Sequence, residues 1–251
     1  MPEKNQPGRF IEIDLMRGLA VIMMVLYHAL FDIYFFNIYP VDVTIGFWKI
    51  SAMITASLFL LLVGISFTIS AAKAEVTMNR RNFFTKYLKR GISILLIAAL
   101  ITIVTWWYLG EGYIIFGILH LIGVSIIIAP LFFHRKMISL YGGIVFIVVG
   151  LLLQVVRGPS FLLPLGVHPD SFYSVDYTPI FPWFGLVLIG IYLGELLYPG
   201  GKRGYTLPEF SQYGKLPELP GTAFAFLGRH SLAIYILHQP VLILLLHPPW
   251  V

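Results

Sequence analysis

The chain has 251 residues, of which 58% are hydrophobic and only 12% are charged. A soluble globular domain averages roughly 45–50% apolar and about 25% charged residues, so this composition excludes an ordinary soluble domain and indicates an integral membrane protein. The formal net charge of +5 does not indicate nucleic-acid binding, because the basic residues gather on one side of the predicted membrane. The absence of cysteine excludes a cysteine nucleophile, a thiolate metal site and disulfides.

Long apolar segments follow one another along the whole chain. A helix needs roughly 20 mainly apolar residues to cross a bilayer. The segments that meet this length lie at about residues 12–36, 49–72, 90–109, 113–133, 137–156, 179–198 and 223–247. The first is too long and too interrupted for a cleavable signal peptide, so we expect it to be retained. We predict an all-α, polytopic transmembrane bundle of about seven spans, forming a single domain over residues 1–251.

Lysine and arginine placement predicts the orientation of these spans. With the N-terminus in the cytoplasm, the cytoplasmic side receives Lys4, Arg9, Arg17, Lys73, Arg80, Arg81, Lys86, Lys89, Arg90, Arg135, Lys136, Lys202, Arg203, Lys215 and Arg229. The outside receives only Lys49 and Arg157. This bias follows the positive-inside rule and predicts a multi-pass cell-membrane protein with its C-terminus outside.

Two connections are long enough to be more than links between spans. The predicted outer one, about 157–178, carries His168, Asp170 and Asp176, and the predicted inner one, about 199–222, is rich in glycine and proline without a helical period. Loops of this length are often functional, although a plain connector explains each equally well.

The first apolar segment carries a stripe of polar side chains. At about 100° per residue, Arg17 lies within ~20° of His28 around the helix axis, and Asp14 and Asp32 lie within ~40° of it. At ~1.5 Å per residue, Arg17 and His28 are ~16 Å apart along the axis. Charged groups in hydrocarbon normally face a protein interior or a water-filled cavity. The stripe therefore predicts a polar conduit with a titratable histidine in its outer part.

The outer and inner halves of this stripe have different interpretations. Asp32 lies one turn beyond His28 and could hydrogen-bond its ring, fix the tautomer and raise its basicity. Asp14 and Arg17 could instead pair with each other at the cytoplasmic boundary, which would be a structural role only.

Further polar residues interrupt the fourth and seventh segments. His120 and His238 are predicted at a depth comparable with that of His28, and Ser231 and Tyr235 share a helical face with His238. Together the histidines predict a catalytic pocket or a metal or haem site, although each alone could simply bond to a neighbouring helix. Paired spacings such as His-x3-His are missing, so we expect no metal. Arg229 opens the seventh segment at the predicted inner surface.

A cluster of basic residues precedes the third segment. It consists of Arg80, Arg81, Lys86, Lys89 and Arg90. Such a cluster attracts a phosphorylated ligand such as coenzyme A, and it equally attracts lipid headgroups or serves only to orient the chain.

Several of these segments resemble a known family. Arg17 and His28 are separated by ten residues, which resembles the Arg-x10-His motif of membrane-bound acyltransferases. The segments IDLMRGLAVIMMVLYHALFDI, FLLLVGISFTIS, FGILHLIGVS and LGRHSLAIYILHQPVL together resemble the catalytic domain of the heparan-alpha-glucosaminide N-acetyltransferase family. The resemblance covers most of the chain.

The resemblance implies transfer of an acetyl group from cytosolic acetyl-CoA, a cosubstrate, to a sugar or glycan acceptor on the far side. It implies catalytic roles for His28, Asp32 and His120. It assigns coenzyme A binding to Arg17 and the inner basic residues Arg80, Arg81 and Arg90. From the residues themselves we expect Asp14 to contribute to that binding, and we expect a pocket formed by Arg229, Ser231, Tyr235 and His238. His28 could act as a general base on the acceptor amine or hydroxyl, or be transiently acetylated.

Two other functions use the same residues. A proton-coupled small-solute transporter or channel would use the polar stripe for flux without acyl chemistry, and a non-catalytic scaffold would need it only for stability. Membrane lipids are expected partners in every case, and a homodimer is compatible with the sequence.

Overall fold

A computed structural model describes residues 10–206 and 218–246, and most of these residues are helical. The α-helices are α1 (Ile11–Phe35), α2 (Gly46–Thr77), α3 (Arg80–Leu109), α4 (Ile118–Ile128), α5 (Lys136–Leu153), α6 (Ile180–Leu197), α7 (Glu218–Arg229) and α8 (Ser231–Leu246). Short 3₁₀ turns lie at η1 (Ala129–Leu131), η2 (Ser160–Leu165) and η3 (Pro199–Gly201). Within the described ranges the strand-like pairing is limited to one isolated bridge, between Arg157 and His168. The prediction of an all-α fold is confirmed.

The helices belong to two compact units. One unit combines residues 1–59 with 207–251, and the other is formed by residues 60–206. Helix α2 begins in the first unit and continues into the second. The sequence predicts that residues 1–251 form a single membrane domain, and this stays a prediction. Lys4, Arg9 and Lys215, which contribute to the predicted charge bias, lie outside the described residues.

Among the described residues, five helices are long and apolar enough to cross a membrane, namely α1, α2, α3, α5 and α6, and the number rises to six if α7 and α8 together form one bent span. The predicted span 113–133 is a shorter apolar helix, over Ile118–Leu131. Gly110 and Gly112 have φ values of 70° and 72°, so the chain turns there and α4 starts five residues later than expected. Seven spans and the orientation of the N-terminus remain predictions.

Two helices are longer than the apolar segments that predicted them. Residues 73–89, expected as a basic loop, extend α2 and α3 instead and leave only Met78 and Asn79 between them. The side chain of Asn79 accepts a hydrogen bond of 2.9 Å from the backbone N–H of Asn82 and so caps α3. Hydropathy finds the part of a helix that lipid covers, whereas the cap decides where the helix begins.

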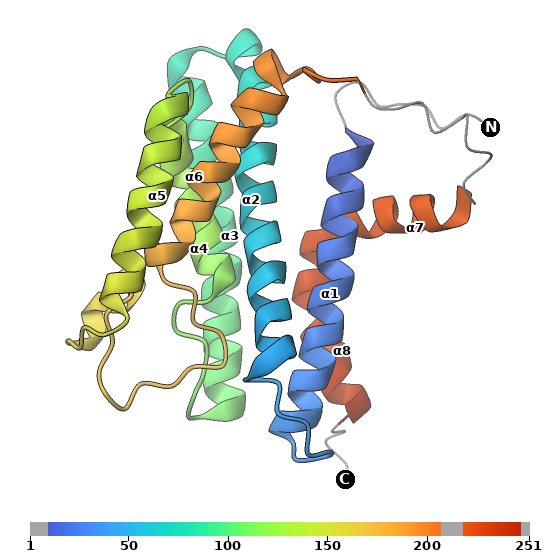
Figure 1. The fold of residues 1–251 in the computed structure, drawn as a ribbon, viewed down its shortest axis with the longest axis vertical. Helices are drawn as coiled ribbons and strands as arrows, with labels where there is room; N and C mark the ends of the chain where they lie inside the picture. The colour runs from blue at the N-terminus through green and yellow to red at the C-terminus, as the bar shows by residue number, and fades with distance from the viewer. Residues whose placement is uncertain (1–9, 207–217, 247–251) are drawn as a thin grey trace. The chain divides into compact units, whose positions relative to one another are not determined.

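In the unit formed by residues 60–206, α5 packs along α6 (Figure 1), and helix backbones approach each other at pairs of glycines. A Cβ at Gly64 of α2 would overlap backbone atoms of α6, and one at Gly190 of α6 would overlap the carbonyl oxygen of Leu61. Gly143 of α5 and Gly185 of α6 approach each other in the same way. Small residues let helix backbones approach closely in membranes, where hydrophobic burial does not drive helices together.

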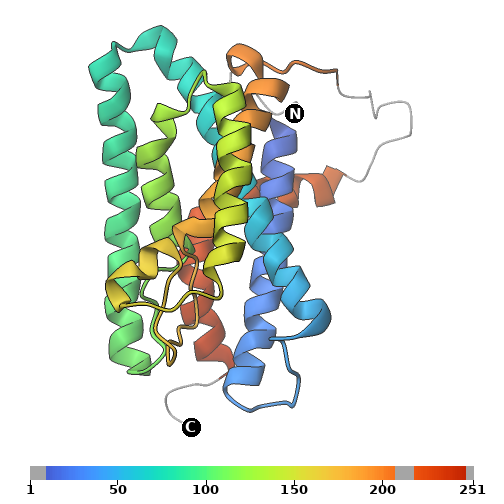
Figure 2. The same ribbon diagram turned by 60° about the vertical axis from the view of Figure 1, so that its left-hand side comes forward.

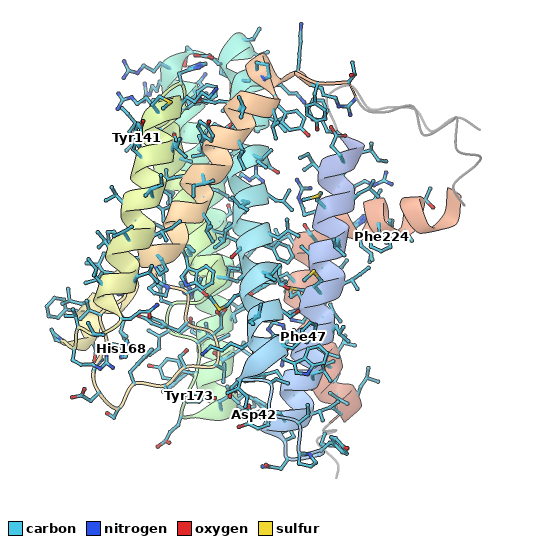
Figure 3. The ribbon with its side chains drawn as sticks, in the orientation of Figure 1. Asp42, Phe47, Tyr141, His168, Tyr173 and Phe224 are labelled. Atoms are coloured by element: carbon cyan, nitrogen blue, oxygen red, sulfur yellow. The ribbon has the colours of Figure 1, made fainter. Side chains whose placement is uncertain are left out.

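The other unit is built from α1, α7 and α8. Helix α7 lies across α1, and α8 then runs beside α1 (Figures 1 and 2). The break between α7 and α8 at His230 bends the chain by 86°, so the single helix predicted over 223–247 is wrong. The crossing is tight, because a Cβ at Gly18 of α1 would overlap the carbonyl oxygen of Phe224, which Figure 3 labels on α7. Because of the bend, α7 and α8 contact α1 at two different places along its length.

Candidate functional site

The most unusual feature of the first unit is a pair of histidines on α1 and α8. The ring centroids of His28 and His238 are 4.8 Å apart, and the rings are nearly perpendicular. His238 is only 8% exposed, and the ring of Tyr235 lies 5.6 Å from it. The bend at His230 turns α8 along α1, and this is what brings together two residues 210 positions apart in the sequence. Of the three histidines predicted to share a pocket, these two are in contact.

Both histidines are held in the same tautomer. The Nδ1 atom of His28 lies 3.0 Å from the carbonyl oxygen of Met24, and Nδ1 of His238 lies 2.7 Å from that of Tyr235. A carbonyl oxygen can only accept a hydrogen bond, so Nδ1 must carry the proton in each ring. The Nε2 atom of each neutral ring therefore keeps its lone pair, which is the state required of a base or a nucleophile.

Asp32 does not play the part that its spacing from His28 predicted. Its Oδ1 atom accepts a 2.7 Å hydrogen bond from Nε2 of Gln239, while the Met24 carbonyl occupies Nδ1 of His28. Asp32 is 2% exposed, so this bond partly compensates the cost of burying a carboxylate. Sequence reasoning missed Gln239, although a polar amide next to His238 in an apolar helix is a signal that could have found it.

Three buried atoms of this cluster lack a hydrogen-bond partner among the described residues. They are Oδ2 of Asp32, Nε2 of His238 and Oε1 of Gln239. With Nδ1 protonated in His238 and the Gln239 amide donating to Asp32, all three are acceptors. Buried polar atoms are normally paired, so a group of unpaired acceptors is complementary to a molecule that donates hydrogen bonds. We refer to Asp32, His238 and Gln239 as the acceptor cluster.

The remaining predicted residues of this unit lie nearer the crossing of α1 and α7. Arg17 and Asp14 form an ion pair of 3.1 Å, so the pairing interpretation of these two residues describes the geometry. The Nε atom of exposed Arg229 donates to the carbonyl of Ala225, one turn earlier in α7. Ser231 is the first residue of α8.

His120 belongs to the other unit and has the opposite tautomer. The backbone N–H of Gly117 donates to its Nδ1 atom at 3.3 Å, so Nε2 carries the proton and points to the hydroxyl of Thr102 at 3.4 Å. Both ring nitrogens of His120 therefore have a partner: Nδ1 bonds to the residue that precedes α4, and Nε2 contacts Thr102 of α3. That His120 shares a pocket with His28 and His238 stays a prediction.

The loop before α6 secures the same helix end. Oδ2 of Asp176 accepts a 3.0 Å hydrogen bond from the backbone N–H of Ile118, the first residue of α4, and Oδ1 accepts one from Thr178. Burial raises the pKa of the Asp176 carboxyl, and these hydrogen bonds oppose the shift. The predicted outer loop 157–178 is therefore tied to α4. Figure 3 labels two further residues of this loop, His168 and Tyr173.

Three of the predicted coenzyme A contacts lie on α3. Arg80 and Arg81 are its first two residues, Arg90 is its eleventh, and all three are exposed. A group of three or more histidine, cysteine or acidic side chains able to hold a metal ion was not found in the described part of the chain.

The apolar helices of spanning length fit a membrane protein, and the histidine pair, in which His238 is buried, gives it a polar site. The family model described as "Heparan-alpha-glucosaminide N-acetyltransferase, catalytic" matches residues 9–240. The chain therefore belongs to this family, which makes it a member of a membrane acetyltransferase family, and the resemblance predicted from the sequence is confirmed. Searches of curated proteins and of solved structures found no significant match.

Proposed function

We propose that the protein transfers an acetyl or similar acyl group from cytosolic acyl-CoA to a sugar or glycan acceptor on the other side of the membrane, with His28 as the reacting histidine. The family supports acetyl transfer in general. The observation that carries the proposal is the contact between His28 and His238, in which both rings keep an Nε2 lone pair.

His28 can serve in either of two routes. In direct transfer, its Nε2 atom takes the proton from the acceptor hydroxyl or amine while that group attacks the thioester carbonyl, and the departing thiolate of coenzyme A receives the proton. In covalent transfer, Nε2 attacks the thioester first and coenzyme A leaves as a thiolate; the acceptor hydroxyl or amine then takes the acetyl group from the acetylimidazolium and releases its proton, which balances the thiolate. The Met24 carbonyl supports both routes, because it holds the Nδ1 proton and orients the ring.

The acceptor cluster suits the second substrate of this reaction. Sugar hydroxyls and amines are hydrogen-bond donors, and Oδ2 of Asp32, Nε2 of His238 and Oε1 of Gln239 are buried acceptors. Leaving such atoms unpaired costs about 1–3 kcal/mol each, and a substrate that donates to them recovers part of this free energy. We therefore assign this cluster to the acceptor substrate.

The coenzyme A end of the site is proposed from charge. Arg17 lies on the same helix as His28, and Arg80, Arg81 and Arg90 are exposed cations that suit the phosphates of the nucleotide. Because Arg17 is paired with Asp14, a phosphate would have to share or replace that carboxylate.

The test is acetyl transfer by purified protein in liposomes, with labelled acetyl-CoA on one face and amino sugars on the other. We expect His28→Ala to lower the rate at least ~100-fold, as is typical for removal of a general base. His134→Ala is the control, because His134 is an exposed histidine of the other unit, just before α5, and belongs neither to the histidine pair nor to the acceptor cluster. It should retain the wild-type rate.

The same preparation separates the competing functions. Folded wild-type protein that neither binds acetyl-CoA nor transfers its acetyl group would end the enzyme proposal. Proton or solute flux in those liposomes, lost in His28→Ala, would then favour a transporter that uses the polar stripe of α1.

A further inference from the structure

Gln239 connects α8 to α1 at the level of the histidine pair. Its amide donates to Asp32 across 207 positions of sequence, and the bond is short, at 2.7 Å. Asp32 lies one turn after His28 on α1, and Gln239 directly follows His238 on α8. The hydrogen bond and the ring contact therefore join the same two turns of the two helices.

Helix α8 needs such an attachment at this point. At its start it follows the 86° bend, and the close crossing of α7 at Gly18 lies about ten residues before His28 along α1. Pro240 lies inside α8 and has no backbone N–H, so the carbonyl of Ile236 loses its helical partner. The backbone of α8 is thus weakened next to His238, and a side-chain bond is well placed to fix this turn.

We propose that Gln239 is a positioning residue, whose amide orients the Asp32 carboxylate and holds the turn of α8 that presents His238 to His28. Its catalytic consequence rests on the proposed function, whereas its effect on the histidine pair does not. With Oδ1 bound to Gln239, the unpaired Oδ2 atom of Asp32 has one fixed direction. A residue that acted only in folding would stabilise the protein without setting the geometry of the pair.

The absence of native cysteine makes the geometry directly measurable. In a His28→Cys/His238→Cys protein, we expect mild oxidation to form a disulfide, because the two side chains that the cysteines replace are in contact, and the loss of maleimide-PEG labelling on a gel reports its rate. We expect Gln239→Leu to slow disulfide formation at least tenfold. Gln154→Leu is the matched control, because Gln154 is exposed at the end of α5 and should leave the rate unchanged.

A swap of the two partners separates positioning from simple damage. In Asp32→Asn/Gln239→Glu, the amide on α1 donates to the carboxylate on α8, so the bond reforms with its donor and acceptor exchanged. We expect the swap to restore disulfide formation to within about twofold. Thermal unfolding identifies folded variants, and a folded swap protein whose disulfide forms as slowly as in Gln239→Leu would overturn the proposal.

Kinetics on proteins with both histidines present give the second measurement. We expect Gln239→Leu to lower kcat at least tenfold because the histidine pair is disturbed, and also to raise KM for the acceptor, because Oε1 of Gln239 belongs to the acceptor cluster; the loss in kcat is the part that substrate binding alone does not explain. Unchanged disulfide formation or unchanged kcat in Gln239→Leu overturns the positioning role. If the disulfide results are as expected but wild-type protein transfers no acetyl group, the acetyltransferase proposal fails and the role of Gln239 in holding the pair stands.

Discussion

At the scale of single residues, the buried His238 and the half-buried His120 differ in how their ring nitrogens are paired. His238 uses Nδ1 for the Tyr235 carbonyl, and its buried Nε2 has no partner among the described residues. His120 uses one nitrogen to accept from Gly117 and the other to reach Thr102. An unpaired buried nitrogen reduces stability, which proteins accept mainly at functional sites, whereas a fully paired imidazole is a structural element.

Replacing each of these two histidines with phenylalanine should have opposite consequences. His238→Phe keeps a ring beside His28, loses one hydrogen bond and removes an unpaired atom, so we expect the free energy of unfolding to change by no more than about 1 kcal/mol while acetyl transfer is lost. His120→Phe leaves the N–H of Gly117 without its partner, and we expect it to destabilise the protein by about 1–3 kcal/mol. Thermal unfolding in detergent and the transfer assay measure both. Equal destabilisation by the two substitutions would contradict this distinction.

At the scale of elements, α7 is defined by its contact with α1. A Cβ at Gly228 would overlap the carbonyl oxygen of Asp14, just as one at Gly18 would overlap that of Phe224. The two helices therefore approach backbone to backbone, and the position of α8 depends on this crossing. Glycine is required here for lack of space and not for an unusual backbone angle.

Two glycines of α7 provide a matched test of this crossing. Gly228→Ala should force the helices apart and destabilise the protein by about 1–3 kcal/mol, in the range seen for overpacked cores. A Cβ at Gly221 of the same helix meets nothing within 4 Å, so Gly221→Ala should be neutral or stabilising by up to about 1 kcal/mol. Thermal unfolding distinguishes the two. Similar values for both variants would mean that the crossing does not limit stability.

At the scale of the whole molecule, the family match spans both compact units. It covers residues 9–240, while the units divide at residues 59 and 207. The acceptor cluster lies in one unit, and His120 and the basic start of α3 lie in the other. The orientation of the chain in the membrane is therefore the next property to measure, because the proposed transfer requires coenzyme A and the acceptor on opposite sides.

Single cysteines in the cysteine-free chain would measure this orientation. Charge bias predicts that Arg81→Cys, at the start of α3, reacts with an impermeant maleimide only after permeabilisation. Tyr173→Cys should react in intact cells, because Tyr173 is 59% exposed and lies in the predicted outer loop. Labelling of both positions from one side would contradict the predicted topology and, with it, a transfer across the membrane.

Local sequence was sufficient for several parts of this picture. The first span was predicted at 12–36 and the helix covers Ile11–Phe35, and the sixth was predicted at 179–198 and the helix covers Ile180–Leu197. The spacing of His28 and Asp32 placed both on one face of α1, and ordered segments identified the family. Hydropathy, helical period and motif order depend only on residues near one another in the chain, so they can be recognised without coordinates.

Other features exist only once distant segments meet. Asp32 was expected to bond to His28, but the carbonyl of Met24 holds that ring and Gln239 holds Asp32. The bend at His230 and the late start of α4 are likewise set by a helix crossing and by a loop that returns to cap a helix end. In each case, more than one neighbouring group could form the hydrogen bond or fill the space. The choice between them depends on residues tens to hundreds of positions away, so it is made by tertiary packing.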